Sequence, residues 1–170
     1  MSAADALNIL HGLGEAGVTV VVGGGWGVDA LLGEQTRSHA DLDLWLSALQ
    51  FEFLVRAVSA MGLDRLYPWG DDRPWNFVLL DGGRLRVDLH VFEIRADGEL
   101  HYGSAIDGEV LPSGALDGRG TIGGVEVACE SIEASLRFHT GYQPRKVDRQ
   151  DMSNLCERFG LRLPDELRCS

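Results

Sequence analysis

The first third of the chain alternates between helical and extended hydrophobic patterns. Apolar residues recur at helical spacing over residues 3–16, and Ser2 stands where a helix N-cap is expected. The run VTVVV at 18–22 consists of β-branched residues without a break, which is typical of a strand buried on both faces. Three glycines at 23–25 end that strand, and residues 26–32 read as a short helix. The pattern predicts a helix, a strand, a glycine turn and a second helix.

A strict polar and apolar alternation follows in DLDLWL, residues 41–46. A strand here places Asp41 and Asp43 on one face and the leucines on the other, because successive side chains point to opposite faces. The next residues, 47–50, resemble a capping box, which predicts a helix running to about Met61.

Residues 76–92 predict a β-hairpin around the DGG turn at 81–83. Leucine and valine occupy alternate positions of the returning strand. Arg86, Asp88 and His90 occupy the positions between them and share its polar face.

The rest of the chain separates into a glycine-rich part and a helical part. Residues 97–127 suggest brief edge strands and offer little chemistry, whereas residues 131–160 return to helical spacing. The predicted fold class is α/β (α+β): a mixed, twisted sheet with flanking helices and a C-terminal helical segment. We expect one domain over residues 1–170, with its sheet core at about 18–127 and its C-terminal helices at about 131–160.

Composition narrows the class of protein. The 170 residues are 45% hydrophobic, but no apolar run approaches the roughly 18 residues that would span a bilayer, so no membrane segment is expected. No secretory signal is recognised either, and a cytoplasmic location is predicted. The three cysteines show no spacing that suggests zinc or a disulfide framework. A net charge of −11 argues against a nucleic-acid partner, because such proteins place many cations along phosphates.

The acids are the main candidates for chemistry. Two carboxylates at positions i and i+2 of a strand lie about 7 Å apart, close enough to share divalent ions. Asp41 and Asp43 satisfy this spacing, and Asp88 adds a third acid on another apolar strand. The alternative is an edge strand with a solvated polar face. The glycine turn, with Gly24 and Gly25, offers backbone amides to phosphate oxygens. Together these residues predict a site for a metal-bound nucleoside triphosphate.

The glycine turn also permits another interpretation. Residues 25–30, GWGVDA, satisfy the GxGxxA fingerprint of dinucleotide-binding domains. However, two acids run along the following strand where the fingerprint needs one, and the hairpin interrupts the expected βαβ alternation.

These motifs resemble the nucleotidyltransferase superfamily, which carries a glycine motif, then DhDh, where h is hydrophobic, and then a third acid on a later strand. GGGWGVDALLG at 23–33 and TRSHADLDL at 36–44 resemble the antibiotic nucleotidyltransferases, both lincosamide enzymes and aminoglycoside 2''-adenylyltransferases. VDLH at 87–90 and FHTGYQPRKVDRQD at 138–151 are more similar to the lincosamide group, whereas Gly23 is more similar to the aminoglycoside group.

The resemblance implies transfer of a nucleoside monophosphate, usually AMP from ATP, to an antibiotic hydroxyl, with release of pyrophosphate. It implies that Asp41 and Asp43 ligate two Mg²⁺ ions, and that Asp88 completes the metal shell or accepts the hydroxyl proton. His90 is a candidate ligand or base in the lincosamide-like pattern; it is equally compatible with a histidine satisfied on a sheet face.

Further contacts to the nucleotide are expected from Gly24, Gly25, Arg37, His39 and Lys146. A bidentate guanidinium clamp is the reason for choosing Arg37. Alternatively, Arg37 and His39 belong to a surface loop without a role in nucleotide binding.

The expected partners are a nucleoside triphosphate and a small-molecule antibiotic, and the resemblance is compatible with a homodimer. The acceptor, lincosamide or aminoglycoside, stays open. A member of the same fold that binds nucleotide without turnover, like an antitoxin, is the alternative function.

Overall fold

The computed structural model describes residues 1–71, 73–140 and 142–168 of the chain. Gly141 of the predicted 138–151 motif and Cys169 lie outside the described residues. Among the described residues, no helix has both the length and the apolar character needed to cross a membrane.

The chain forms helices and strands in the mixed order predicted. The helices are α1 (Ala3–Glu15), α2 (Gly24–Leu32), α3 (Phe51–Ala60), α4 (Ile132–Phe138) and α5 (Lys146–Phe159), with 3-10 turns η1 (Ala48–Gln50) and η2 (Asp165–Leu167). The strands are β1 (Val21–Val22), β2 (Leu42–Ser47), β3 (Arg65–Pro68), β4 (Asn76–Leu80), β5 (Arg86–Ile94), β6 (Leu100–Tyr102), β7 (Glu109–Val110), β8 (Gly118–Ile122) and β9 (Val125–Cys129).

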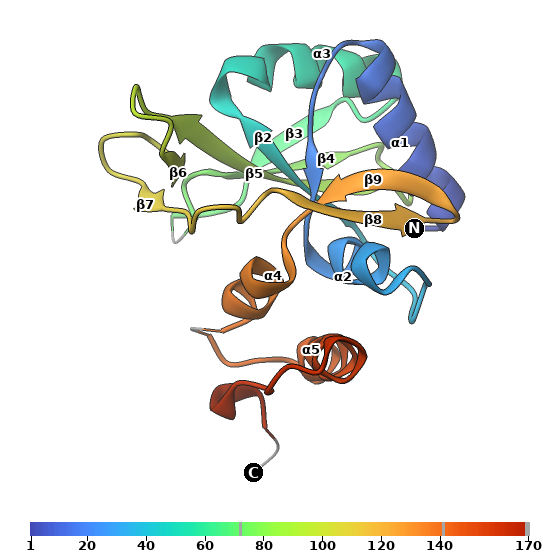
Figure 1. Cartoon of the computed structure of the whole chain (residues 1–170). Coiled ribbons are helices and arrows are strands. Elements are labelled where there is room, and N and C mark those ends of the chain that lie inside the picture. Colours follow the sequence, from blue (N-terminus) through green and yellow to red (C-terminus); the bar gives the residue numbers. More distant parts are fainter. Residues whose placement is uncertain (72, 141, 169–170) are drawn as a thin grey trace.

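The strands form a mixed sheet in the order β3-β4-β5-β2-β1-β9-β8, with β6 and β7 attached beyond β5. At its centre β2 runs parallel to β5 and antiparallel to β1. Helices α1 and α3 lie on one side of the sheet, and α2, α4 and α5 lie on the other (Figure 1). This arrangement confirms the predicted mixed α+β architecture.

The main core lies between the sheet and the α1–α3 pair. Leu42, Leu44 and Leu46 of β2 are fully buried, as are Val87 and Leu89 of β5. Burying one such side chain stabilises a fold by about 1.5–3 kcal/mol. The polar positions of β2 and β5 consequently face the α2, α4 and α5 side, which sets the location of the candidate site.

Several predicted boundaries were wrong for local reasons. The first strand contains only Val21 and Val22, and α2 begins at Gly24, before the predicted start. Ser47 makes no capping hydrogen bond, so the expected capping box is replaced by the short turn η1. Strand β3 was not predicted, because an exposed edge strand carries little hydrophobic periodicity.

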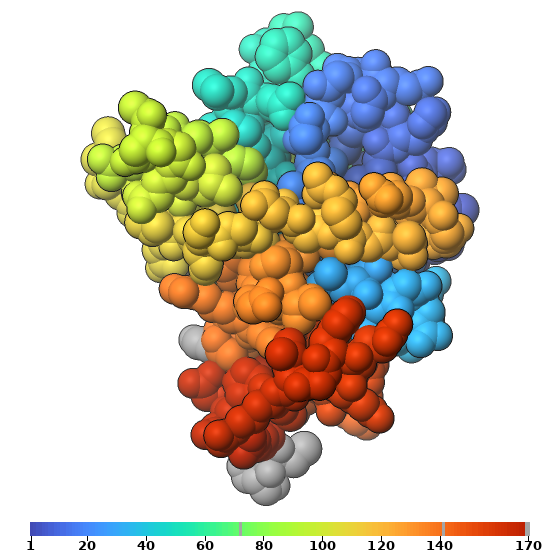
Figure 2. All heavy atoms as spheres, in the orientation of Figure 1, coloured from blue at the N-terminus to red at the C-terminus, as the bar shows by residue number. Residues whose placement is uncertain are grey.

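The C-terminal helices are tied to the sheet through α2. Val28 of α2 packs against Met152 and Leu155 of α5 and against Leu167. In Figure 2 the orange and red C-terminal residues form a lobe that adjoins the light-blue α2 segment. The glycine turn at the start of α2 therefore lies between the sheet and this lobe.

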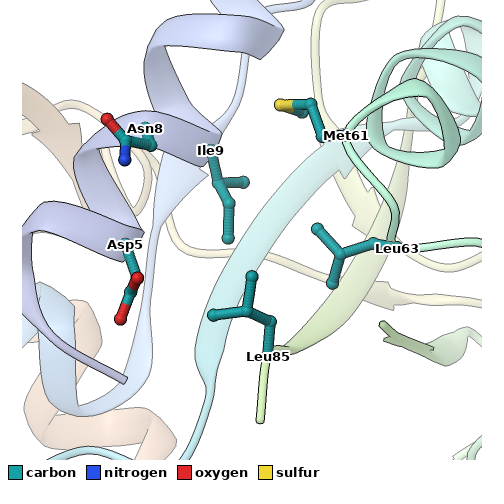
Figure 3. Close-up of a pocket in the computed structure, with 6 residues that line it drawn as sticks. All are labelled: Asp5, Asn8, Ile9, Met61, Leu63 and Leu85. Atoms are coloured by element: carbon teal, nitrogen blue, oxygen red, sulfur yellow. The ribbon is translucent and has the colours of Figure 1, made fainter. Parts of the chain in front are cut away.

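One cavity of about 230 Å³ opens on the opposite side of the sheet, lined by α1 residues together with Met61, Leu63 and Leu85 (Figure 3). Its walls are mostly apolar, and of its two polar residues, Asp5 and Asn8, Asp5 is already paired with Arg84. None of the predicted site residues lines it, so this cavity is separate from the candidate chemistry.

Candidate active site

Strand pairing at the centre of the sheet brings the predicted acids together. Asp43 of β2 and Asp88 of β5 are direct neighbours across the parallel pair, and adjacent strands are about 4.8 Å apart. Asp41 immediately precedes β2, and its Oδ2 lies 4.0 Å from Nε of Arg86. Arg86 in turn donates to both carboxylate oxygens of Asp88, at 2.7 and 2.8 Å. The three acids thus gather on one face around a single guanidinium.

The electrostatics of these acids reflect their crowding. Burial raises the pKa of Asp41 above its ordinary value, and the charge of Asp43 raises it further. Burial also raises the pKa of Asp88; the hydrogen bonds from Arg86 oppose this shift, while the charge of Asp43 adds to it. The cluster therefore holds more negative charge than its surroundings neutralise.

Asp43 behaves differently from its two neighbours. Burial pushes its pKa upward, but the hydrogen bond and charge of His90, with the charges of His139 and Arg86, outweigh that effect. The net result is a pKa below the ordinary value, so this carboxylate is the one that the site keeps most firmly ionised.

The raised pKa of Asp41 predicts a gain in stability when the charge is removed. An acid whose pKa is higher in the folded state than in the unfolded state makes the folded state less stable as pH rises. Asp41→Asn should therefore stabilise the metal-free protein at neutral pH. The side chain is 35% exposed, so we expect only about 0.5 kcal/mol after solvent screening. The gain should vanish below the ordinary pKa of 3.8.

Urea unfolding of both proteins with a chelator present, at neutral and acidic pH, measures this difference. Asp64→Asn is a matched control, because Asp64 is exposed and lies outside the cluster. A loss of stability for Asp41→Asn at neutral pH would contradict the electrostatic interpretation.

The glycine turn approaches the acids directly. Gly23 is the N-cap of α2, and no side chain caps the first turn of this helix. Gly24 has φ +54, a left-handed conformation that favours glycine. A Cβ added at Gly24 would overlap Oδ2 of Asp43. The start of α2 therefore lies beside the acid cluster, and phosphate binding by the amides of Gly24 and Gly25 stays a prediction.

Arg37 lies near Gly25, but its guanidinium is engaged elsewhere. It forms a bidentate pair with Asp151 of α5, with Nε–Oδ1 at 2.9 Å and Nη2–Oδ2 at 2.6 Å. The side chain of Asp151 is 2% exposed. This pair ties the connection after α2 to the C-terminal lobe, a role that the sequence interpretation did not include.

His39 also has a structural environment. The ring is buried, lies 4.3 Å from the ring of Trp26 between centroids, and pairs through Nε2 with Oδ2 of Asp29 at 2.5 Å. Asp29 additionally accepts hydrogen bonds from Thr36. These contacts lock the loop that leads into β2 and so help to position Asp41.

Lys146 is the first residue of α5 and is exposed. The preceding residue, Arg145, lies close enough for its charge to lower the pKa of Asp41, although burial dominates that pKa. Arg145 pairs with Asp148 at 2.8 Å. Of these two cations, Arg145 is the one whose charge bears on the pKa of Asp41.

His90 lies on the same face as the acids and contacts Asp43 through Nε2–Oδ1 at 3.2 Å. Its other nitrogen, Nδ1, lies 3.1 Å from Nδ2 of Asn76. The ring also stacks on Trp45, with centroids 4.9 Å apart and planes 29° apart. Both ring nitrogens and one face of the His90 imidazole therefore have partners within the fold.

A buried carboxylate that sequence reasoning missed lies behind this face. Glu130 is 3% exposed and accepts hydrogen bonds from Trp45 Nε1 at 2.5 Å and from Ser135 Oγ at 3.0 Å. Burial raises its pKa. A Cβ at Gly23 would come within 2.5 Å of Glu130 Oε1, so the glycine turn packs directly on this group. No motif in the sequence marks Glu130.

The acid cluster has the donor chemistry of a magnesium site. Carboxylate oxygens are the ligands that Mg²⁺ prefers, and Asp41, Asp43 and Asp88 supply them from one face. Within residues 1–71, 73–140 and 142–168, no three or more His, Cys, Asp or Glu side chains are arranged to hold a metal. Arg86 occupies both oxygens of Asp88. The donor chemistry fits a divalent cation, while the hydrogen bonds from Arg86 take up one lone pair on each carboxylate oxygen of Asp88.

The dinucleotide-binding alternative is wrong. That motif needs the strands on either side of the glycine turn helix to be parallel. Here β1 and β2 are antiparallel, with Val21 opposite Trp45. The glycine turn therefore belongs to a different architecture.

Comparison with known proteins agrees with this architecture. A family model described as aminoglycoside-2''-adenylyltransferase matches residues 5–155. A lincosamide resistance protein from Staphylococcus haemolyticus is 28% identical over 138 residues, which cover 81% of this chain and 84% of that protein.

Two solved structures share the fold. A crystal structure of the lincosamide antibiotic adenylyltransferase LnuA with lincomycin bound has a TM-score of 0.77 and 26% identity, covering 89% of this chain and 94% of that chain. A structure of ANT(2'')-Ia in complex with adenylyl-2''-tobramycin has a TM-score of 0.73 and 24% identity, covering 91% of this chain and 87% of that chain.

Proposed function

The chain belongs to the aminoglycoside-2''-adenylyltransferase family, and from this premise we propose that it transfers AMP from ATP to a hydroxyl of a lincosamide or aminoglycoside, releasing pyrophosphate. Family membership confirms the predicted antibiotic nucleotidyltransferase. The observation that carries the finer proposal is the meeting of Asp41, Asp43 and Asp88 beside the uncapped start of α2.

The glycine turn and the acid cluster suit the two parts of a metal-bound triphosphate, the phosphate oxygens and the metal ion. The amides of Gly24 and Gly25 would hold phosphate oxygens, because a helix N-terminus attracts anions. Asp41 and Asp43 would hold Mg²⁺, with Asp88 joining them through the lone pairs that Arg86 does not use. When bound, the ion supplies positive charge that stabilises the reacting phosphoryl group and makes the acceptor hydroxyl more acidic.

Asp88 is the candidate acceptor of the hydroxyl proton. It lies beside Asp43, and burial with the neighbouring negative charge raises its pKa. A carboxylate with a raised pKa is a better proton acceptor than an ordinary one. Arg37, His39 and Lys146 stay predictions as nucleotide contacts, and the present partners of Arg37 and His39 favour structural roles for these two.

Both candidate acceptor classes, lincosamides and aminoglycosides, have support among the similar proteins. The family model carries an aminoglycoside description, whereas the Staphylococcus relative is a lincosamide resistance protein. The net charge of −11 suits a polycationic aminoglycoside. A cytoplasmic location, a homodimer and the absence of a nucleic-acid partner stay predictions.

Incubation of the full chain with ATP, Mg²⁺ and a panel of lincosamides and aminoglycosides should yield one drug that gains the mass of AMP, read by mass spectrometry. Pyrophosphate should appear in step with the adduct, and neither should form with a chelator present. The same panel identifies the acceptor.

Thermal stabilisation by Mg²⁺ and ATP without adduct or pyrophosphate would contradict the transfer reaction. That result would favour the alternative of a nucleotide-binding domain without turnover. A melting temperature that neither Mg²⁺ nor ATP raises would contradict the proposed nucleotide and metal site itself.

A further inference from the structure

The surroundings of His90 contain a chain of hydrogen bonds that ends on Asp43. The hydroxyl of Tyr102 contacts Oδ1 of Asn76. Nδ2 of Asn76 lies 3.1 Å from Nδ1 of His90, and Nε2 of His90 lies 3.2 Å from Oδ1 of Asp43. Four side chains from four strands, β6, β4, β5 and β2, are therefore joined in one line.

The acidic end determines the direction of this chain. An ionised carboxylate only accepts hydrogen bonds, so Nε2 of His90 must carry the hydrogen that it shares with Asp43. In a ring with one hydrogen, Nδ1 is then an acceptor, and Asn76 must present its NH₂ group. The carbonyl oxygen of Asn76 consequently faces Tyr102, whose hydroxyl must donate.

The chain is held rigidly by its packing. Asn76 is 2% exposed, so both ends of its amide depend on these partners. Trp45 stacks on His90 and contacts Tyr102 edge-on, with centroids 5.2 Å apart, and its own Nε1 is anchored on Glu130. Rotation of the imidazole would break both of its hydrogen bonds and this stack.

We infer that Tyr102 and Asn76 set the tautomer of His90, and that His90 is a positioning residue for Asp43 rather than the base or a metal ligand. With a hydrogen on Nε2 and Asn76 on Nδ1, neither ring nitrogen offers a lone pair to substrate or metal. The bond from Nε2 holds Oδ1, while Oδ2 of Asp43 points to Gly24. Proton transfer is then left to Asp88.

The tautomer can be read without nucleotide, metal or drug. In ¹⁵N-labelled full-length protein, long-range ¹H–¹⁵N correlation of the five histidines distinguishes a ring protonated on Nε2 from one protonated on Nδ1. His90→Gln identifies the His90 signals by their loss. We expect the Nε2–H pattern. An Nδ1–H ring, a ring protonated on both nitrogens, or averaging between tautomers would overturn the inference.

Two variants test the chain at a distance from His90. Asn76→Asp replaces the donor with a carboxylate acceptor and should add a hydrogen to Nδ1, which gives a ring protonated on both nitrogens because Asp43 still requires the hydrogen on Nε2. Tyr102→Phe removes only the hydroxyl while its ring still packs on Trp45, and it should allow both tautomers. An unchanged His90 spectrum in the folded Tyr102→Phe protein would show that Tyr102 does not set the tautomer.

The effect on activity rests on the function proposed above. Glutamine can present an N–H group to Asp43, so His90→Gln should stay within about fivefold of wild type, whereas His90→Ala should lose about ten- to a hundredfold. The loss should be accompanied by a higher Mg²⁺ requirement. If His90→Gln were as inactive as His90→Ala, the imidazole itself would be needed. An enzyme inactive in every form would reject the proposed function and leave the tautomer result standing.

Discussion

Asp43→Asn is expected to lower the rate of nucleotidyl transfer by about a hundred- to a thousandfold, the size of effect seen when a group aimed at developing charge is removed. The amide keeps the shape of the side chain but loses the negative charge. Asp43 is also the acid on which the other groups converge, since it pairs with Asp88 across the strands, accepts from His90 and abuts Gly24.

Steady-state kinetics with the drug identified by mass spectrometry measures the loss, and circular dichroism checks the fold. Asp41→Asn should act in the same direction, because Asp41 is the second proposed metal ligand. Asp64→Asn is the control, being an exposed aspartate away from the cluster, and it should leave the rate unchanged. Near-normal activity in both Asp41→Asn and Asp43→Asn would remove the proposed mechanism.

Gly24→Ala is expected to reduce activity at least about a hundredfold for a steric reason. The residue has φ +54, where a side chain costs about 1–2 kcal/mol. Its added Cβ would also overlap Oδ2 of Asp43, so either the glycine turn or the carboxylate must shift. Both shifts separate the phosphate-binding amides from the acids.

Gly17→Ala is a matched control that separates backbone strain from this overlap. Gly17 has φ +72 but nothing lies within 4 Å of an added Cβ. Gly24→Ala should lose at least as much stability in urea unfolding as Gly17→Ala, because it adds the overlap to the same backbone strain, and only Gly24→Ala should lose activity. Equal activity in the two variants would show that the approach of Gly24 to Asp43 has no role in transfer.

The acid cluster is expected to lower the stability of the metal-free protein. Three carboxylates share one face, and Arg86 is the cation that pairs directly with Asp88. The expected stabilisation by Asp41→Asn and the expected loss of activity in the same variant are two results of one cause. Carboxylates that crowd on one face repel one another when no cation lies between them.

Strong local patterns in the sequence determined the predicted helices, the β4–β5 hairpin and the faces of β2 and β5. Alternation assigns a face without knowledge of the neighbouring strand, so Asp41 and Asp43 could be grouped from the sequence alone. The spacing of Arg86, Asp88 and His90 on one strand face could likewise be predicted. These inferences needed only the two-residue repeat of side-chain direction along a strand.

Pairing between distant segments could not be predicted in this way. The parallel register that sets Asp43 beside Asp88 joins strands separated by the β3–β4 region, and no local pattern encodes a register between them. The same holds for Arg37, whose partner Asp151 lies 114 residues later. A guanidinium suited to a phosphate is equally suited to a buried carboxylate, and only the fold decides which one it meets.

Tyr102 and Glu130 illustrate the limit most clearly. Tyr102 lies in a segment whose composition suggested little chemistry, and Glu130 follows an edge strand without any motif. The sequence determined which side chains could carry charge, donate hydrogen bonds or bind a phosphate. The tertiary structure decided which of them meet, because the energy of a hydrogen bond or ion pair depends on distances between atoms that chain order does not specify.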